Sequence, residues 1–220
     1  MKYYEAYNER YKIIHDRGEQ WTSNNVTSIL IDTLKKYRIS KDNEILEVGC
    51  GEGRDSIEII NQGYQLLATD ISSEAISYCQ KRYSNHKECF RVLDCLKDTL
   101  DKQFDFIYAV AVLHMFVLDE DRQGFYRFIN NHLKSGCLAL ICSMGDGERE
   151  YSSDIKEAFE LKQRECHRQE VMVPATSCHV VNKETFIKEI DQSGLSIVEF
   201  GYTSIEEEFD VMMYAVIQKR

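Results

Sequence analysis

Residues 44–53 read Glu44-Ile45-Leu46-Glu47-Val48-Gly49-Cys50-Gly51-Glu52-Gly53, a short apolar run followed by three glycines at alternating positions. A helical pattern begins just after this stretch, at Asp55. Glycine allows positive φ angles and lets a ligand lie against bare main chain. The stretch therefore predicts a strand, a tight glycine turn and a helix, with a small ligand bound at the turn.

The spacing of the glycines argues against two common nucleotide-binding motifs. In the dinucleotide fingerprint the third glycine comes three residues after the second. Here Arg54 holds that position and the third glycine comes early, at Gly53. The Lys-Ser/Thr pair of a phosphate-binding loop does not follow either. What remains is an acidic residue followed by Gly-x-Gly-x-Gly.

Apolar runs and helical patterns alternate on both sides of this turn. Such alternation requires a mostly parallel sheet with helices on both faces. Near the C-terminus two strands follow each other without room for a helix, so they must be antiparallel. The predicted strands are 44–47, 65–70, 89–93, 104–112, 136–142, 195–202 and 209–217, and the predicted helices are 26–37, 56–61, 72–83, 119–133 and 182–192.

Two of these strands end in a carboxylate. Asp70 follows the turn by about 20 residues, a spacing at which a carboxylate can accept both hydroxyls of a ribose. Asp94 closes the next strand, and residues 104–114 read Phe-Asp, an apolar run and then Val-Leu-His. In order and spacing, residues 44–142 resemble the class I S-adenosylmethionine (SAM) methyltransferases.

The resemblance implies a Rossmann-like α/β fold, a doubly wound, mostly parallel seven-stranded sheet with an antiparallel strand near the C-terminus. It implies SAM as cofactor and S-adenosylhomocysteine (SAH) as product. It places Glu47 at the amino-acid end of SAM, Asp70 at the ribose and Asp94 at the adenine. The implied cofactor-binding residues are Trp21, Glu47, Gly49, Gly51, Gly53, Asp70, Ile71, Asp94, Cys95, Ala109 and Val110.

Two features set limits on the resemblance. The Asn/Asp-Pro-Pro-Tyr/Phe motif of methyltransferases that act on adenine, cytosine or glutamine amide nitrogens is absent, because Pro174 is the only proline. Cys50 and Glu52 fill the gaps between the glycines, positions that tolerate most residues and carry little information.

The resemblance implies transfer of a methyl group to O, N or S of a small molecule. SAM is already activated, so the protein has to place the nucleophile in line and exclude water. His114 is the candidate general base, because a neutral imidazole can accept a proton near pH 7; a packing role remains the alternative. Tyr11 and His179 are the candidate substrate-binding residues, and the Trp21 ring can alternatively cover the sulfonium.

We expect one domain over residues 1–220, with two segments that cover the site. Residues 1–43 form the predicted N-terminal lid, in which Tyr4, Tyr7 and Tyr11 share one helical face; the alternative is a helix that only docks on the domain. Residues 143–181 form a predicted substrate cover with a helix over 154–168, and a purely structural role for it is equally open.

The net charge of −10 argues against a nucleic-acid partner and leaves a small neutral, cationic or apolar substrate open. The start of the chain carries no signal pattern and no apolar run spans a membrane, so we expect no membrane partner, a cytoplasmic location and a monomer or homodimer. The eight cysteines predict reduced thiols, and Cys166-His167 and Cys178-His179 lack zinc-ligand spacing, so no metal is expected.

Alternatives to a small-molecule methyltransferase are a protein or RNA acceptor, transfer of another group from a SAM derivative, and a non-catalytic SAM-binding regulator.

Overall fold

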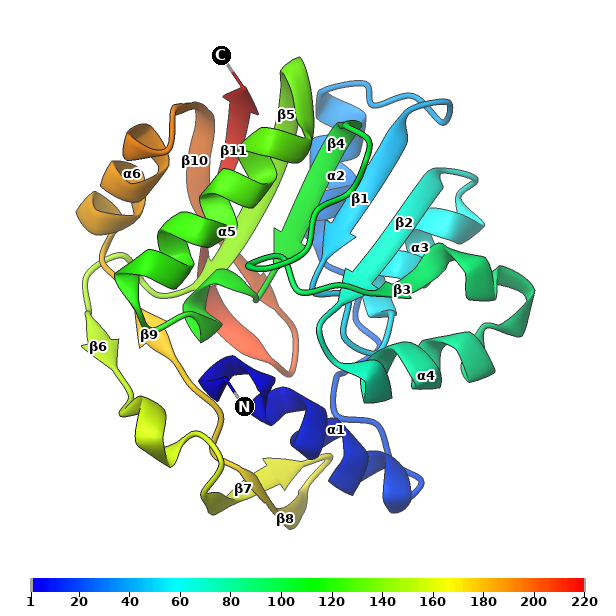
Figure 1. The fold of residues 1–220 in the computed structure, drawn as a ribbon, viewed down its shortest axis with the longest axis vertical. Coiled ribbons are helices and arrows are strands. Elements are labelled where there is room, and N and C mark those ends of the chain that lie inside the picture. Colours follow the sequence, from blue (N-terminus) through cyan, green and yellow to red (C-terminus); the bar gives the residue numbers. More distant parts are fainter. Residues whose placement is uncertain (1, 220) are drawn as a thin grey trace.

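A computed structural model describes residues 2–219 and contains a seven-stranded sheet in the order β10-β11-β5-β4-β1-β2-β3 (Figure 1). β11 runs antiparallel to both of its neighbours, and the other strands run parallel to one another. This confirms the predicted doubly wound sheet with an antiparallel strand near the C-terminus. The strands are β1 (Glu44–Val48), β2 (Gln65–Asp70), β3 (Phe90–Val92), β4 (Phe104–Val110), β5 (Leu133–Met144), β10 (Leu195–Ile205) and β11 (Phe209–Lys219).

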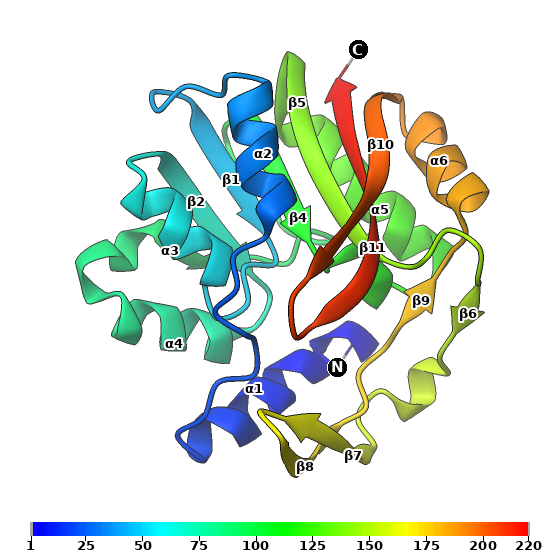
Figure 2. The same cartoon turned by 180° about the vertical axis from the view of Figure 1, so that it is seen from behind.

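Helices cover both faces of this sheet, as Figures 1 and 2 show from opposite sides. On one face the core joins the sheet to α5 and α6, and on the other face it joins the sheet to α2, α3 and α4. Burial on both faces explains why β4 is almost continuously apolar. The helices are α1 (Ala6–Asp16), α2 (Ser28–Lys36), α3 (Arg54–Asn61), α4 (Ser73–Arg82), α5 (Asp119–His132) and α6 (Lys183–Gln192).

Side-chain caps fix where two of the helices begin. The Ser72 hydroxyl accepts a hydrogen bond from the Ala75 amide at 3.1 Å, and the Asn182 side chain accepts one from the Thr185 amide at 2.8 Å. Each cap satisfies a backbone donor that has no partner inside the helix. The polar residues at the start of the predicted patterns are therefore the physical start signals of α4 and α6.

The segment between β5 and α6 differs from the prediction. The prediction of a helix over 154–168 is wrong. The region holds only a short 3₁₀ helix, Ile155–Glu157, and then a hairpin of β7 (Leu161–Cys166) and β8 (Gln169–Pro174). The hairpin turn is formed by His167 and Arg168, with φ angles of 48° and 66°. Two-residue hairpin turns with positive φ usually carry Asn-Gly or Asp-Gly, so the sequence gives no such signal here.

The hairpin and the N-terminal helix lie at the same edge of the sheet. Figures 1 and 2 place α1, β7 and β8 together beyond the carboxyl ends of β1, β2 and β4, with β6 (Tyr151–Ser152) and β9 (His179–Val180) alongside. Ligands of doubly wound folds bind at this edge. Within residues 2–219 no helix has the length and apolar character needed to cross a bilayer.

Candidate functional site

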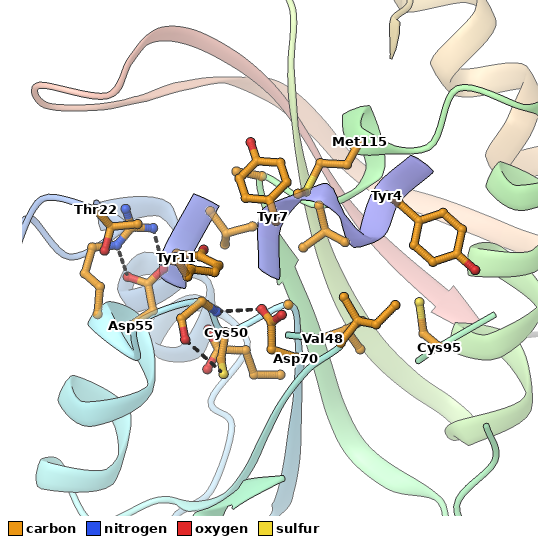
Figure 3. A pocket seen from close by; sticks show the side chains of 18 of the residues that line it. Tyr4, Tyr7, Tyr11, Thr22, Val48, Cys50, Asp55, Asp70, Cys95 and Met115 are labelled. Carbon is orange, nitrogen blue, oxygen red and sulfur yellow. Dashed lines mark hydrogen bonds and ion pairs between the residues drawn. The ribbon is translucent and has the colours of Figure 1, made fainter. Parts of the chain in front are cut away.

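A cavity of about 140 Å³ lies where β1, β2 and β4 end, beneath α1 (Figure 3). Its floor is the glycine turn after β1, and its roof carries tyrosines of the N-terminal segment. The main wall residues are Tyr4, Tyr7, Tyr11, Trp21, Glu47, Val48, Gly49, Cys50, Gly51, Asp70, Ile71, Asp94, Cys95, Val110, Ala111, Val112, Met115, Phe116 and Phe209. The cavity therefore gathers most of the predicted cofactor residues in one place.

At two glycines of the turn, a Cβ would clash with a neighbouring side chain. Gly49 has φ 78°, and a Cβ there would lie 2.2 Å from Cγ2 of Val112. Gly51 has φ 53°, and a Cβ there would lie 2.8 Å from the Tyr11 hydroxyl. Gly53 has φ 81° but is not in the cavity wall; it precedes α3 and lets that turn approach α4 closely. The third glycine thus affects the packing of the turn against α4 and is not part of the cavity wall.

The Asp70 carboxylate is held in one orientation by the backbone. Its Oδ2 accepts a hydrogen bond from the Gly51 amide at 2.8 Å, and its Oδ1 accepts one from the Ser72 amide at 2.8 Å. Burial raises the pKa of this carboxyl above its usual range. A fixed, largely buried acceptor beside the glycine turn suits the paired hydroxyls of a ribose.

Glu47 lies at the end of β1 and is only 3% exposed. It accepts a short hydrogen bond from the Ser56 hydroxyl. Burial, and then repulsion from the nearby Asp55 carboxylate, raise the pKa of Glu47 to about 8. The side chain is therefore protonated at neutral pH, and a cation arriving beside it would favour its ionised form.

Asp94 and Cys95 form the far end of the cavity. The Asp94 carboxylate accepts hydrogen bonds from the Leu96 amide at 3.0 Å and from the Tyr4 hydroxyl at 3.4 Å. It also pairs with Lys97 at 2.9 Å. Burial, followed by the charge of Asp94, raises the pKa of Tyr4, so its phenol stays neutral and acts as a donor.

Glu52 is a site residue that the sequence reasoning missed. Its buried carboxylate accepts hydrogen bonds from the Trp21 amide at 2.9 Å and from the Thr22 amide at 2.7 Å and hydroxyl at 2.8 Å. It also lies 2.8 Å from Nε2 of His15. Glu52 therefore ties the N-terminal segment to the glycine turn.

Arg54 holds the position that the third glycine has in the dinucleotide fingerprint. It also connects the glycine turn to other parts of the chain. Its guanidinium pairs with Asp55 at 2.9 Å and with Glu208 of the β10–β11 turn at 2.9 Å. Asp55 in turn accepts hydrogen bonds from the Thr27 amide and hydroxyl, both at 2.8 Å. The only sequence signal was the presence of charged residues at the end of the predicted glycine turn.

A second, larger cavity of about 870 Å³ adjoins the first. Tyr7, Trp21, Glu208 and Phe209 line both cavities. The other walls come from α1, the β7–β8 hairpin, residues 175–178 and the end of β5. The structure therefore has two adjoining spaces, of which the first is lined by the glycine turn.

His114 lines the second cavity. It is 4% exposed, and its Nδ1 accepts a long hydrogen bond, 3.5 Å, from the Met144 amide. Burial, and then repulsion from Arg122, lower the pKa of His114 to about 4. The imidazole is consequently neutral throughout the physiological pH range.

Several other predicted site residues lie elsewhere. Ala109 is buried in the core, and it is Val110 and Ala111 that reach the first cavity. Tyr11, predicted to contact substrate, lines the first cavity beside the glycine turn and not the second. His179 lies in β9 and is in neither wall; its Nδ1 lies 3.1 Å from the Val117 carbonyl oxygen.

Within residues 2–219 no group of three or more His, Cys, Asp and Glu side chains is arranged to hold a metal ion. Cys166-His167 and Cys178-His179 are thus not parts of such a group among the described residues. Cys166 Sγ and His167 Nε2 both approach the Gln20 carbonyl oxygen, at 3.4 and 2.7 Å, whereas Cys178 Sγ lies 3.5 Å from the Tyr151 hydroxyl.

Residues 46–139 match a family described as a methyltransferase domain. The chain is 26% identical over 121 residues to the probable S-adenosyl-L-methionine-dependent methyltransferase TehB of Haemophilus influenzae, a match that covers 53% of this chain and 41% of that protein. The match therefore spans less than half the length of this relative.

Solved structures show the same fold. The glycopeptide N-methyltransferase MtfA has a TM-score of 0.65 at 16% identity, over 89% of this chain and 97% of that one. A SAM-dependent methyltransferase from Methanosarcina mazei has a TM-score of 0.67 at 18% identity, over 89% and 98%. The magnesium protoporphyrin IX methyltransferase of Synechocystis PCC 6803, solved with bound SAM, has a TM-score of 0.63 at 14% identity, over 87% and 77%.

Proposed function

We propose, on the premise that the chain belongs to the class I SAM-dependent methyltransferases, that it transfers a methyl group from SAM to an O, N or S atom of a small-molecule acceptor. The observation that carries the proposal is the Asp70 carboxylate, held by the Gly51 and Ser72 amides at the mouth of the glycine turn. A bound SAM would supply the activated methyl group, and SAH would be the product.

The wall of the first cavity fits the parts of SAM. Asp70 would accept the ribose hydroxyls, and Asp94 with the Cys95 amide would face the adenine. Glu47 would face the amino group, beside the main chain of Gly49 and Gly51, which carries no Cβ. The residues at this edge thus offer hydrogen-bond acceptors where SAM has donors. The main chain of the glycine turn would let SAM approach it closely.

The N-terminal segment is proposed to act as a lid. A cavity of about 140 Å³ is close to that of an engineered cavity that holds a benzene. SAM is several times larger than benzene, so the tyrosines of α1 have to move outward for the cofactor to enter. Closure of such a segment would exclude water from the reacting atoms.

The second cavity is the proposed acceptor site, with the β7–β8 hairpin as its cover. Its volume, about 870 Å³, is within the range of small-molecule sites. A small acceptor suits such an enclosed space better than a folded protein or an RNA. We also propose a cytoplasmic location, since all eight cysteines are free thiols and a reducing compartment keeps them so.

The first test is calorimetric titration with SAM and SAH, with NAD as the control. We expect micromolar binding of SAM and SAH and none of NAD. Binding of NAD alone, or of none of the three, would contradict the cofactor assignment. A bound but unreactive SAM, with no SAH formed from any phenol, amine or thiol tested, would favour the non-catalytic regulator.

The same titration tests the role of Glu47. Below its pKa of about 8 the free carboxyl is protonated, so pairing with the SAM ammonium must release that proton. Affinity should therefore rise up to tenfold per pH unit between about pH 6 and 8. It should fall at higher pH, because an α-amino group loses its own proton near pH 8.

Proton release is measured by repeating the titration at pH 6.5 in phosphate and in imidazole, which both buffer at this pH and differ in ionisation enthalpy. We expect release of close to one proton by the natural protein and none by the Glu47→Gln variant. Equal heats in the two buffers for the natural protein would show that Glu47 does not ionise when SAM binds.

His114 is proposed to accept the proton of the nucleophile. Its pKa of about 4 makes it a weak base, so it would act late, when the methylated nucleophile has become strongly acidic. With SAM saturating, His114→Gln should lower kcat about a hundredfold and leave the Kd of SAM unchanged. The activity of the natural protein should also lack a histidine-like decline between pH 7.5 and 5.5. An unchanged kcat in the variant would leave His114 with a packing role.

A further inference from the structure

We propose that the second cavity recognises its acceptor through an anionic group, a carboxylate or a phosphate, placed against Arg10 and Arg164. The proposal rests on the function proposed above and specifies its substrate class. It goes beyond the expectation drawn from the net charge of −10, which left a neutral, cationic or apolar substrate open.

Arg10 is a buried cation without a carboxylate partner. It is 4% exposed and lines the cavity, and no ion pair involves it in the described part of the chain. Its Nη2 donates to the carbonyl oxygens of Pro174 and Ala175 at 2.7 and 2.9 Å, and to the Thr176 hydroxyl at 2.9 Å. Its Nε has no hydrogen-bond partner.

The surroundings hold this guanidinium firmly in place. Its centre lies 4.7 Å from the ring centroid of Tyr7 and 4.5 Å from that of Trp21. Burial lowers the pKa of Arg10, and the charge of Arg164 lowers it further. Carbonyl oxygens and rings compensate a buried charge only in part. An incoming anion would supply the missing counter-charge.

Arg164 brings a second positive charge to the same cavity. It lies on β7, two residues from Cys166, so the two side chains point to the same face of the hairpin. Cys166 is buried against Ile14 of α1, which shows that this face is turned toward α1. Arg164 also forms no ion pair among residues 2–219. Arg10 from α1 and Arg164 from β7 therefore bring positive charge to the same cavity.

The acidic residues of the cavity do not cancel this charge. Glu208 is already occupied by Arg54 at 2.9 Å and by the Ser23 amide at 2.7 Å. Glu165 also lines the cavity and is exposed, as Arg164 is, but it follows Arg164 in β7, so its side chain leaves the opposite face of the strand. Glu207 is exposed in the β10–β11 turn, whereas Arg168 adds a further positive charge at the hairpin tip.

The position of this pair suits an anchor for the acceptor. The Tyr7 and Trp21 rings that flank Arg10 are also walls of the first cavity. An acceptor held by its anionic end at Arg10 can therefore extend its nucleophile past these rings toward the proposed SAM site. The acidic net charge acts weakly here, because salt screens exposed charges beyond about 8–10 Å.

The experiment titrates the SAH-loaded protein with benzoate, phenyl phosphate and inorganic phosphate, and with benzamide as the neutral counterpart of benzoate. We expect saturable binding of at least one organic anion and at least tenfold weaker binding of benzamide. The preference between benzoate and phenyl phosphate identifies the carboxylate or phosphate form. Arg164→Gln should weaken the anion about tenfold or more, the typical loss for one charge-assisted hydrogen bond.

Arg91→Gln is the matched control. Arg91 is an exposed arginine of β3, so this substitution removes the same charge at a place away from the cavity. It should leave anion binding unchanged, and both variants should bind SAH like the natural protein. Arg10→Lys keeps the charge and loses the planar donors, and it should weaken the anion as well.

Binding of SAH without saturable binding of any anion would overturn the proposal and leave the methyltransferase assignment intact. So would equal binding of benzamide and benzoate, or an Arg164→Gln variant that binds the anion as well as the natural protein does. Failure of SAH itself to bind would instead count against the proposed function, and the anion titrations on the ligand-free protein would still decide the anion site.

Discussion

Replacing Asp70 by alanine is expected to weaken SAM binding about a hundredfold or more. The carboxylate is proposed to accept two ribose hydroxyls, and each charge-assisted hydrogen bond contributes about 1.5–3 kcal/mol. Two such bonds correspond to a factor of about a hundred or more in Kd. The substitution also removes the acceptor of the Gly51 amide, which shapes the glycine turn. Calorimetric titration of the variant with SAM and SAH measures the effect.

Asp101→Ala is the matched control, because Asp101 is an exposed aspartate in the loop before β4 and away from the cavity. Circular dichroism and thermal unfolding establish that the Asp70→Ala variant is folded before it is titrated. A folded variant whose Kd for SAM equals that of the natural protein would show that the ribose does not lie against Asp70. A loss of affinity in Asp101→Ala as well would point to an indirect cause.

The cofactor side of the site could be predicted from the sequence because the fold places it there. Parallel strands end at one edge, so residues that follow β1 and β2 come together there without any knowledge of side-chain packing. Gly49, Gly51 and Asp70 are of this kind, and the structure gathers them in one cavity. On β4 the same reasoning falls one residue short, at Ala109 in place of Ala111, since strand ends are fixed by hydrogen bonds that the sequence does not display.

The acceptor side could not be predicted, because its residues are brought together by long-range packing. Arg10 and Arg164 are 154 positions apart in the sequence, and they line one cavity only because α1 packs on the β7–β8 hairpin. The hairpin itself carries charged residues on its exposed face and His-Arg at its turn. Those features resemble a solvated helix more than a strand, and the predicted helix over 154–168 was wrong for this reason.

Glu52 shows the same limit within the glycine turn. The positions between the glycines were interpreted as uninformative, which is reasonable while the turn is considered alone. The significance of Glu52 comes from the Trp21 and Thr22 amides, which arrive from a segment about 30 residues earlier in the chain. A short motif can therefore predict where a ligand binds and still leave open what covers it.

Replacing Glu52 by alanine is expected to release the N-terminal segment from the glycine turn. The change leaves the Trp21 and Thr22 amides and the Thr22 hydroxyl without an acceptor. Each unsatisfied buried group costs about 1–3 kcal/mol, so opening of the segment becomes the easier alternative. Hydrogen exchange of peptides covering residues 2–25 should accelerate at least tenfold, while exchange in β1 and β4 stays close to that of the natural protein.

Glu58→Ala is the matched control for this prediction, because the Glu58 side chain in α3 accepts a local hydrogen bond, from the Gln62 side chain that caps the same helix, at 2.6 Å. It should leave exchange in residues 2–25 unchanged. If the segment is a lid, Glu52→Ala should also speed SAH dissociation, measured by stopped-flow displacement, more than it slows association, since an open cover no longer retains the ligand. Faster exchange with an unchanged dissociation rate would mean that residues 2–25 dock on the domain without gating the cavity, and unchanged exchange would mean that Glu52 does not hold them.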